Sequence, residues 1–131
     1  MDAATRKLVR ERARNRCEYC GLPQSALPLT SFHVEHIVPK QHRGGDDSAN
    51  LALSCHHCNL HKGPNLTGVD PQTVRIEPLF DPRKDLWEEH FERRGFLVLG
   101  LTPKGRVTVG VLAVNSQTQL DARRALGMSD D

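Results

Sequence analysis

Two Cys-x-x-Cys pairs constrain this chain more than any other feature. Cys17 and Cys20 form the first pair, Cys55 and Cys58 form the second, and the 131 residues contain no other cysteine. Paired spacing, with no signal-peptide-like segment and no long apolar run, favours a metal-binding protein of the cytoplasm over a secreted disulfide scaffold. Because structural zinc takes a closed tetrahedron of ligands, we predict one Zn²⁺ ion bound by all four thiolates.

A bound metal would compensate for a core that buries little apolar surface. Apolar residues make up 37% of the chain and aromatic residues only 5%, so a single domain of this length buries a modest core. The net charge of +2 does not by itself indicate a nucleic-acid-binding protein. Residues 1–16, however, carry six basic side chains against two acidic ones, which suggests contact with a phosphate backbone. A solvated helix face explains any single one of those bases nearly as well.

Local signals divide the first 66 residues into two helices and two strands. Asp2 can cap a helix over residues 3–15 that turns Leu8, Val9 and Ala13 inward. Gly21 is expected to adopt the positive φ that lets both thiolates of the first pair point at one metal. The other expected elements are a loop at 22–31, a strand at 32–38, a long polar loop at 39–50, a strand at 51–54 and a short helix from the second cysteine pair to Gly63-Pro64.

Residues 67–131 give weaker signals. We expect strands at 73–77 and 96–101, a turn at 102–105, a helix from Ser116 to Gly127, and fraying at 128–131. A helix at 85–92 would place Leu86, Trp87, His90 and Phe91 on one apolar face, packed against the core. Residues 107–114 fit either a strand, because of their β-branched side chains, or a helix, because of the spacing of their valines.

The segment from Glu35 to Gly63 reads EHIVPKQHRGGDDSANLALSCHHCNLHKG. Glu35-His36 is followed by Asn50 and then by Asn59, and the intervening positions include Pro39, Gly44-Gly45, Asn50-Leu51 and Lys62-Gly63. This pattern resembles the HNH endonucleases, whose motif is Asp/Glu-His, then Asn, then His or Asn. The resemblance covers roughly residues 14–66. The later runs LFDPRKDLWEEHF and GLTPKGRVTV are similar to the tail of small stand-alone bacterial HNH proteins.

The resemblance implies a role for each motif residue. His36 would be the general base, since an imidazole that titrates at about pH 6.5 can accept a proton from water. Glu35 and Asn59 would bind a catalytic Mg²⁺ or Mn²⁺ through oxygen atoms, although most relatives have the shorter Asp at position 35. Alternation along a strand places Glu35 and His36 on opposite faces, yet both side chains would have to reach the same scissile phosphate. We therefore expect the strand to twist or end at His36.

The other candidate residues have supporting roles. Asn50 belongs with His36 among the catalytic positions, and we expect its amide to tie the long loop together and to hold His36 in orientation. Four thiolates leave His56 and His57 without a role at the zinc. The residues expected to contact phosphate, each of which could also be an ordinary exposed base, are Lys40, Arg43, His61 and Lys62.

These features predict an α+β protein with a zinc-stapled ββα-metal (His-Me finger) HNH core. Residues 1–66 would form that core with its N-terminal helix, and residues 67–131 an α+β extension packed on it as one compact unit. The expected activity is metal-dependent hydrolysis of DNA, by nicking or double-strand cleavage. We expect no association with a membrane. The sequence leaves open whether the protein forms a homodimer or binds a partner protein. The alternatives are a zinc-ribbon nucleic-acid-binding module without catalysis, which would not need the complete motif, and a nuclease subunit active only with a partner.

Overall fold

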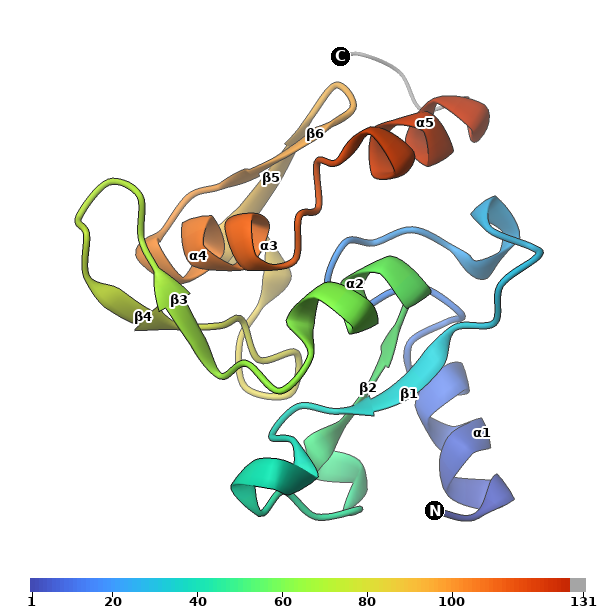
Figure 1. Cartoon of the computed structure of the whole chain (residues 1–131). Helices are drawn as coiled ribbons and strands as arrows, with labels where there is room; N and C mark the ends of the chain where they lie inside the picture. Colours follow the sequence, from blue (N-terminus) through green and yellow to red (C-terminus); the bar gives the residue numbers. More distant parts are fainter. Residues whose placement is uncertain (128–131) are drawn as a thin grey trace.

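The computed structural model describes residues 1–127, and the fraying expected for residues 128–131 lies outside this range (Figure 1). Within the described residues, the strands form three separate antiparallel hairpins, β1–β2, β3–β4 and β5–β6. The elements in chain order are α1 (Ala3–Arg12), the 3₁₀ turn η1 (Gln24–Ala26), β1 (His33–His36), η2 (Lys40–His42), η3 (Ser48–Asn50), β2 (Leu51–Ser54), α2 (His56–Lys62), β3 (Thr67–Val69), β4 (Ile76–Pro78), α3 (Trp87–His90), β5 (Phe91–Arg94), β6 (Leu97–Gly100), α4 (Pro103–Val111) and α5 (Gln117–Ala125). None of these helices is long and apolar enough to cross a membrane.

The first 66 residues follow the predicted order of helix, hairpin and helix. Asp2 caps α1 by accepting a hydrogen bond from the Thr5 backbone, as predicted. The helix ends at Arg12 rather than at residue 15, because Arg14 and Asn15 adopt left-handed backbone angles. Val9 is buried as expected, whereas Leu8 is 48% exposed and is not part of the inward stripe.

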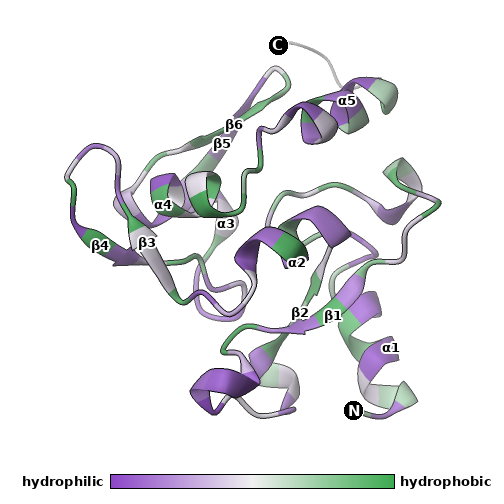
Figure 2. Cartoon of the chain, viewed as in Figure 1, coloured by the Kyte–Doolittle hydropathy of each residue, from purple (hydrophilic) through white to green (hydrophobic). Residues whose placement is uncertain are grey.

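Strand β2 has the predicted bounds, and β1 is shorter than predicted because it pairs with β2 only from His33 to His36. The hairpin leads directly into α2, which stops at Gly63 as predicted; Gly63 has a positive φ. The connection between the strands contains the turns η2 and η3, and Figure 2 shows η2 as almost entirely hydrophilic. Hairpin and α2 therefore form one continuous unit of two strands and a helix.

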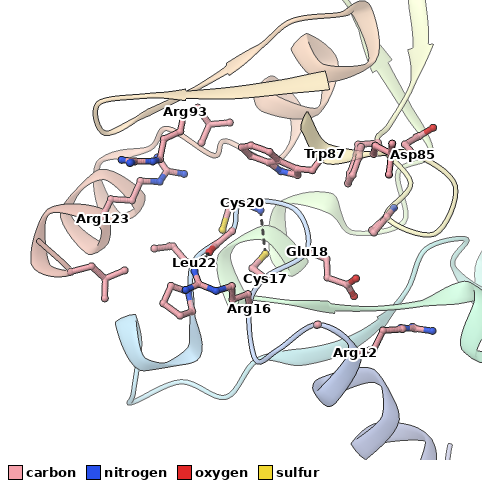
Figure 3. A pocket seen from close by; sticks show the side chains of 18 of the residues that line it. Arg12, Arg16, Cys17, Glu18, Cys20, Leu22, Asp85, Trp87, Arg93 and Arg123 are labelled. Carbon is pink, nitrogen blue, oxygen red and sulfur yellow. Dashed lines mark hydrogen bonds between the residues drawn. The ribbon is translucent and has the colours of Figure 1, made fainter. Parts of the chain in front are cut away.

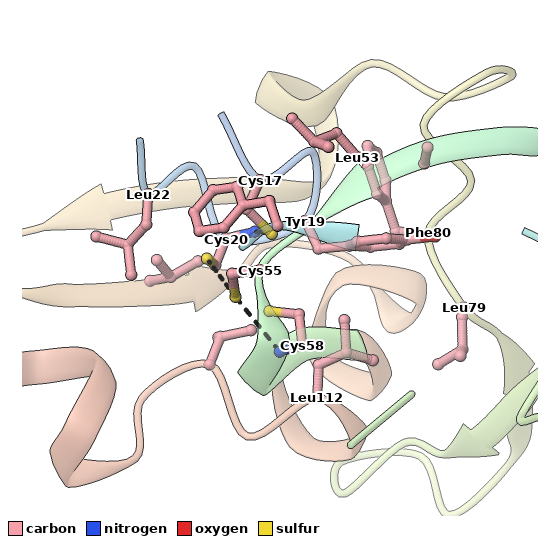
Figure 4. Packing of buried hydrophobic residues seen from close by; sticks show 14 of the residues in the cluster. Cys17, Tyr19, Cys20, Leu22, Leu53, Cys55, Cys58, Leu79, Phe80 and Leu112 are labelled. Carbon is pink, nitrogen blue, oxygen red and sulfur yellow. Dashed lines mark hydrogen bonds between the residues drawn. The ribbon is translucent and has the colours of Figure 1, made fainter. Parts of the chain in front are cut away.

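The four cysteines come together in the interior beside this unit. Their sulfur atoms all lie within 4.8 Å of one another, and all four residues are buried. The Sγ atoms of Cys20 and Cys55 are 3.8 Å apart, which is about the edge of a sulfur tetrahedron around Zn²⁺ with bonds of about 2.3 Å. Gly21 has the predicted positive φ, and Figure 4 shows the sulfurs gathered between the segment that holds Cys17 and Cys20 and the start of α2. The donor set therefore fits a structural zinc ion.

The tail departs most from prediction at residues 102–105. Instead of a turn, Thr102 caps α4 by accepting a hydrogen bond from Gly105 N at 3.0 Å, and Pro103 takes the first helical position, which suits proline. A Cβ at position 105 would lie 2.0 Å from the His90 carbonyl oxygen, so glycine lets α4 begin against the neighbouring chain. The ambiguous segment 107–114 is helical to Val111. Helix α5 begins and ends as predicted.

The segment predicted as a helix over 85–92 is helical only from Trp87 to His90. Phe91 instead begins β5, because residues 91–94 pair with β6 across the tight turn at Gly95, which has a positive φ. Phe91 is buried and Trp87 is partly buried, but Leu86 is 62% exposed and does not join the predicted apolar face. The strand predicted at 73–77 begins only at Ile76, and its partner β3 was not predicted.

Tail and core share one interior. The Trp87 indole donates a hydrogen bond to the Tyr19 carbonyl at 2.9 Å, and the rings of Phe80 and Tyr19 meet edge to face. The His57 ring lies 2.9 Å from the Ala113 carbonyl, a second contact between core and tail. Within the tail, Arg106 binds both oxygens of the buried Asp70, which fixes the loop after β3 to α4.

Zinc content tests the cysteine cluster. Protein purified under reducing conditions should contain about one Zn²⁺ per chain, and Cys55→Ser should lower both zinc content and melting temperature because metal binding contributes folding free energy. Ser54→Ala, which removes the hydroxyl that donates to the Cys55 carbonyl but no thiolate, is the matched control for zinc content. Two disulfides and no metal, found by mass spectrometry, would contradict the prediction.

The packing of the tail is tested at Trp87. Trp87→Ala should lower the free energy of unfolding by about 3 kcal/mol, the lower end of the range for Trp→Ala, because the ring is only partly buried. The exposed neighbour is the control: Leu86→Ala should leave stability nearly unchanged. Chemical denaturation of both variants measures the difference, and equal stabilities would show that the indole does not hold the tail to the core.

Candidate functional site

His36, the last residue of β1, lies beside a carboxylate that the motif did not single out. Its Nε2 atom is 2.6 Å from Asp46 Oδ1, and the His36 and Asp46 side chains are 20% and 46% exposed. An ionised carboxylate only accepts hydrogen bonds, so Nε2 carries a proton, and in the neutral form of the imidazole Nδ1 keeps its lone pair. The hydrogen bond from His36, aided by the charge of Lys40, lowers the pKa of Asp46. Lys40 Nζ is 3.7 Å from the same oxygen.

The loop that carries Asp46 is braced by Asn50. The Asn50 side chain accepts a hydrogen bond from Val38 N at 2.9 Å and donates to Val38 O at 3.0 Å and Gly45 O at 2.9 Å. A Cβ on Gly44 would lie 1.6 Å from Val38 O, so only glycine allows the loop to return this close to the strand. These contacts place Asp46 next to the end of β1. The sequence signal for Asp46 is its position directly after Gly44-Gly45 in the polar loop.

Glu35 faces the opposite way from His36. The strand ends at His36 as predicted, but Glu35 is only 8% exposed and turns toward α2, in keeping with strand alternation. One carboxylate oxygen accepts the Tyr19 hydroxyl and the other lies 3.3 Å from Lys62 Nζ. Burial raises the pKa of Glu35, and the charge of Lys62 opposes that shift. A carboxylate has about four acceptor positions, so oxygen lone pairs remain for a cation.

Lys62 does not have the predicted role in phosphate contact. Its side chain is 2% exposed, and Nζ donates to the carbonyls of His36 at 3.2 Å and Ile37 at 3.0 Å in addition to its ion pair with Glu35. Three acceptors satisfy the three N–H groups of an ammonium. Lys62 therefore joins α2 to the end of β1 and is unavailable to substrate.

Asn59 lies on α2 one turn before Lys62, so the two side chains share a helix face. Within the described residues, the Asn59 side chain has no hydrogen-bond partner, and its amide oxygen remains available as a ligand. Glu35 on β1 and Asn59 on α2 are therefore the candidate oxygen donors for a metal ion. Oxygen donors of this kind suit Mg²⁺ or Mn²⁺.

The remaining predicted phosphate contacts are exposed. Lys40 and Arg43 lie in and just after η2, and Arg43 has a left-handed backbone conformation. His61 is exposed on α2, stacks on His57 with ring centroids 4.1 Å apart, and donates to the His57 carbonyl. Lys40 alone of these lies next to the His36–Asp46 pair.

Comparisons with known proteins agree with the motif. Residues 17–65 match the family model described as HNH endonuclease. The Septu protein PtuB of Bacillus thuringiensis is 30% identical over 120 residues, which cover 88% of this chain and 43% of that relative. The chain therefore spans less than half the length of this relative. No solved structure gives a significant match.

The matched segment contains all four cysteines, the Glu35-His36 pair, Asn50 and Asn59. It also contains the loop that holds Asp46 against His36. Residues 17–65 of this chain therefore form a domain of the HNH endonuclease family.

Proposed function

We propose that this chain is a metal-dependent HNH endonuclease that hydrolyses phosphodiester bonds in DNA. The observation that carries the proposal is the His36–Asp46 pair, with an imidazole nitrogen left free to accept a proton at a partly exposed position. A module that only binds nucleic acid needs neither the pair nor the braced loop beneath it. The motif match to residues 17–65 supports the same reaction class.

In the proposed reaction, His36 Nδ1 takes a proton from a water molecule as the water oxygen bonds to phosphorus. The bond from phosphorus to the 3′ oxygen breaks, and the released 3′ oxygen takes a proton from solvent, which leaves 5′-phosphate and 3′-hydroxyl ends. Asp46 fixes the imidazole orientation and stabilises the imidazolium that forms, as a carboxylate does in other histidine-based sites. Lys40, exposed beside Asp46, is placed to bind a phosphate oxygen.

Glu35 and Asn59 are the proposed ligands of the catalytic Mg²⁺ or Mn²⁺. The ion would supply Lewis-acid stabilisation of the leaving oxygen. Tyr19 and Lys62 hold the Glu35 carboxylate in one orientation. Asn50 has a supporting role in this scheme, since its three hydrogen bonds fix the loop rather than face the substrate.

Two other functions compete with this one. The first is a zinc-containing nucleic-acid-binding module without catalysis. The second is a nuclease subunit that needs a partner, which the longer relative makes relevant because more than half of that protein has no counterpart in this chain. Purified protein incubated with plasmid and a series of Mg²⁺ and Mn²⁺ concentrations separates the autonomous nuclease from the other two functions, since only an autonomous nuclease nicks DNA alone.

Removal of the general base should abolish most cleavage but not binding. His36→Ala should lower the rate of plasmid nicking by about 10²–10⁴-fold, the usual contribution of general-base catalysis. Asn59→Ala should instead shift the nicking curve to higher Mg²⁺ concentration. His42→Ala, an exposed histidine of the same loop, is the control and should cleave normally. Wild-type rates in His36→Ala would exclude His36 as the base.

The role of Asp46 can be isolated with an adjacent matched change. Asp46→Asn should reduce kcat by about tenfold, a part of the general-base effect, with little change in KM because the residue orients His36. Asp47→Asn alters the same charge one residue away, where the side chain only caps Ala49 N, and should behave as wild type. The nitrogen chemical shifts of His36 supply a second readout. The fixed protonation of Nε2 should be lost in the Asp46→Asn variant and kept in the Asp47→Asn variant.

A further inference from the structure

The β3–β4 hairpin carries an apolar surface that the rest of the described chain leaves uncovered. Val69 and Ile76 are cross-strand neighbours, and they are 59% and 72% exposed. The opposite face of the hairpin packs on α4, because a Cβ at Gly68 would lie 2.6 Å from Val111 Cγ2. Figure 1 shows the hairpin at the periphery of the molecule, with its turn away from the β1–β2 hairpin. The proposed nuclease reaction uses none of these residues.

The turn of this hairpin contains a strained valine. Val74 has a φ of 63° and is 77% exposed. A β-branched side chain is disfavoured in the left-handed region of backbone angles, which glycine and asparagine adopt more readily. Because Val74 is exposed, burial inside the chain does not offset this cost. An apolar side chain in a strained and exposed position points to a contact outside the chain.

Strand β4 has a free edge beside this surface. Backbone hydrogen bonds from Asp70 N to Arg75 O at 2.9 Å and from Leu79 N to Leu66 O at 3.0 Å flank the paired strands. Hydrogen-bonded and non-hydrogen-bonded pairs alternate along an antiparallel ladder, so Ile76 directs its N–H and C=O away from β3. In the part of the chain that the structure describes, β4 pairs with no other strand. The edge therefore offers a donor and an acceptor to a further strand.

The charges on this edge are complementary to themselves. Arg75 and Glu77 flank Ile76, and neither forms an ion pair with another described residue. The pKa of Arg106 is raised mainly by its hydrogen bond to Asp70 and less by the charge of Glu77, and Arg106 binds both Asp70 oxygens. When two β4 strands run antiparallel about Ile76, each arginine lies opposite the glutamate of the other copy. Opposite charges attract at such positions, whereas charges of one sign would repel.

We propose that the β3–β4 hairpin is a homodimer interface, in which β4 pairs antiparallel with β4 of a second copy. Ile76 lies at the two-fold axis and exchanges two backbone hydrogen bonds with its counterpart. Two Arg75–Glu77 ion pairs form on the face of the sheet that packs on α4. The result is a four-stranded sheet across the two copies. The proposal does not depend on the nuclease reaction.

The same register gives the exposed apolar residues neighbours. Ile76 and Val69 of both copies form one row on the outer face of the sheet, and Val74 lies opposite Pro78 of the partner copy. Pro78 has no N–H to donate, so the pairing ends there and is short. A strand from an unrelated protein could use the free edge, but the order of charges about Ile76 favours a second copy of this chain.

Sedimentation of the zinc-loaded full chain tests the interface. Between about 1 µM and about 1 mM, a range that covers weak to moderate association, the chain should change from monomer to dimer. Ile76→Lys places two ammonium groups at the axis and should weaken dimerisation by at least about tenfold. Leu29→Lys is the matched control, because Leu29 is 97% exposed outside the hairpin, and this variant should dimerise normally.

Charge exchange tests the register. Arg75→Glu and Glu77→Arg should each weaken dimerisation by about tenfold, because like charges then meet twice. An equimolar mixture of the two variants should form a heterodimer, since the acidic edge of one copy faces the basic edge of the other. The fluorescence of Trp87, the single tryptophan, checks that each variant is folded, because Trp87 lies in the cleft between the first cysteine pair and the tail (Figure 3).

Amide hydrogen exchange supplies a readout at the edge itself, and the Ile76 N–H should exchange more slowly in the dimer. The proposal is overturned if the folded wild type stays monomeric at the highest concentration, or if Ile76→Lys dimerises like wild type. It is also overturned if the folded charge variants do not associate when mixed. A wild type that is monomeric alone and binds another protein through β4 would likewise contradict it.

Discussion

The architecture depends on four thiolates drawn into one buried cluster. Cys17 and Cys20 come from the turn after α1, whereas Cys55 and Cys58 begin α2, so the cluster closes a loop that contains the whole β1–β2 hairpin. Four thiolates packed together in an apolar interior repel one another unless a cation joins them. Because few aromatic residues are available for a core, such a cation would hold the hairpin and the helix in a fixed relative orientation.

A series of contacts connects the cysteine cluster to the candidate site. Tyr19 lies between the first two cysteines, receives the Trp87 indole on its carbonyl and gives its hydroxyl to Glu35. Glu35 pairs with Lys62, whose ammonium also holds the carbonyls at the end of β1. The position of His36 is thus determined from one side by the cysteine cluster and from the other by the loop braced through Asn50. We infer that the tail acts on the site through Trp87.

Sequence patterns predicted the elements whose signals are local. Gly21, β2, α2 and α5 follow from turn chemistry, alternation and helix caps. The errors came from tertiary contacts: α4 begins at Thr102-Pro103 because glycines let it approach the β5–β6 hairpin, and Lys62 is buried because Glu35 and two carbonyls surround it. Asp46 was missed because a carboxylate in a polar loop has no periodic signal. Only the return of the loop onto Val38 brings it to His36.

The Phe80–Tyr19 and His57–Ala113 contacts have a consequence for how this segment can be reused. The family match ends at residue 65, yet both contacts join residues inside the match to residues well beyond it. A fragment cut after residue 66 would leave Tyr19, buried in the whole chain, without its aromatic neighbour, and His57 without its carbonyl. We infer that the HNH segment of this protein does not fold stably without the tail. Grafting it into another scaffold would require a substitute for the surface that the tail supplies.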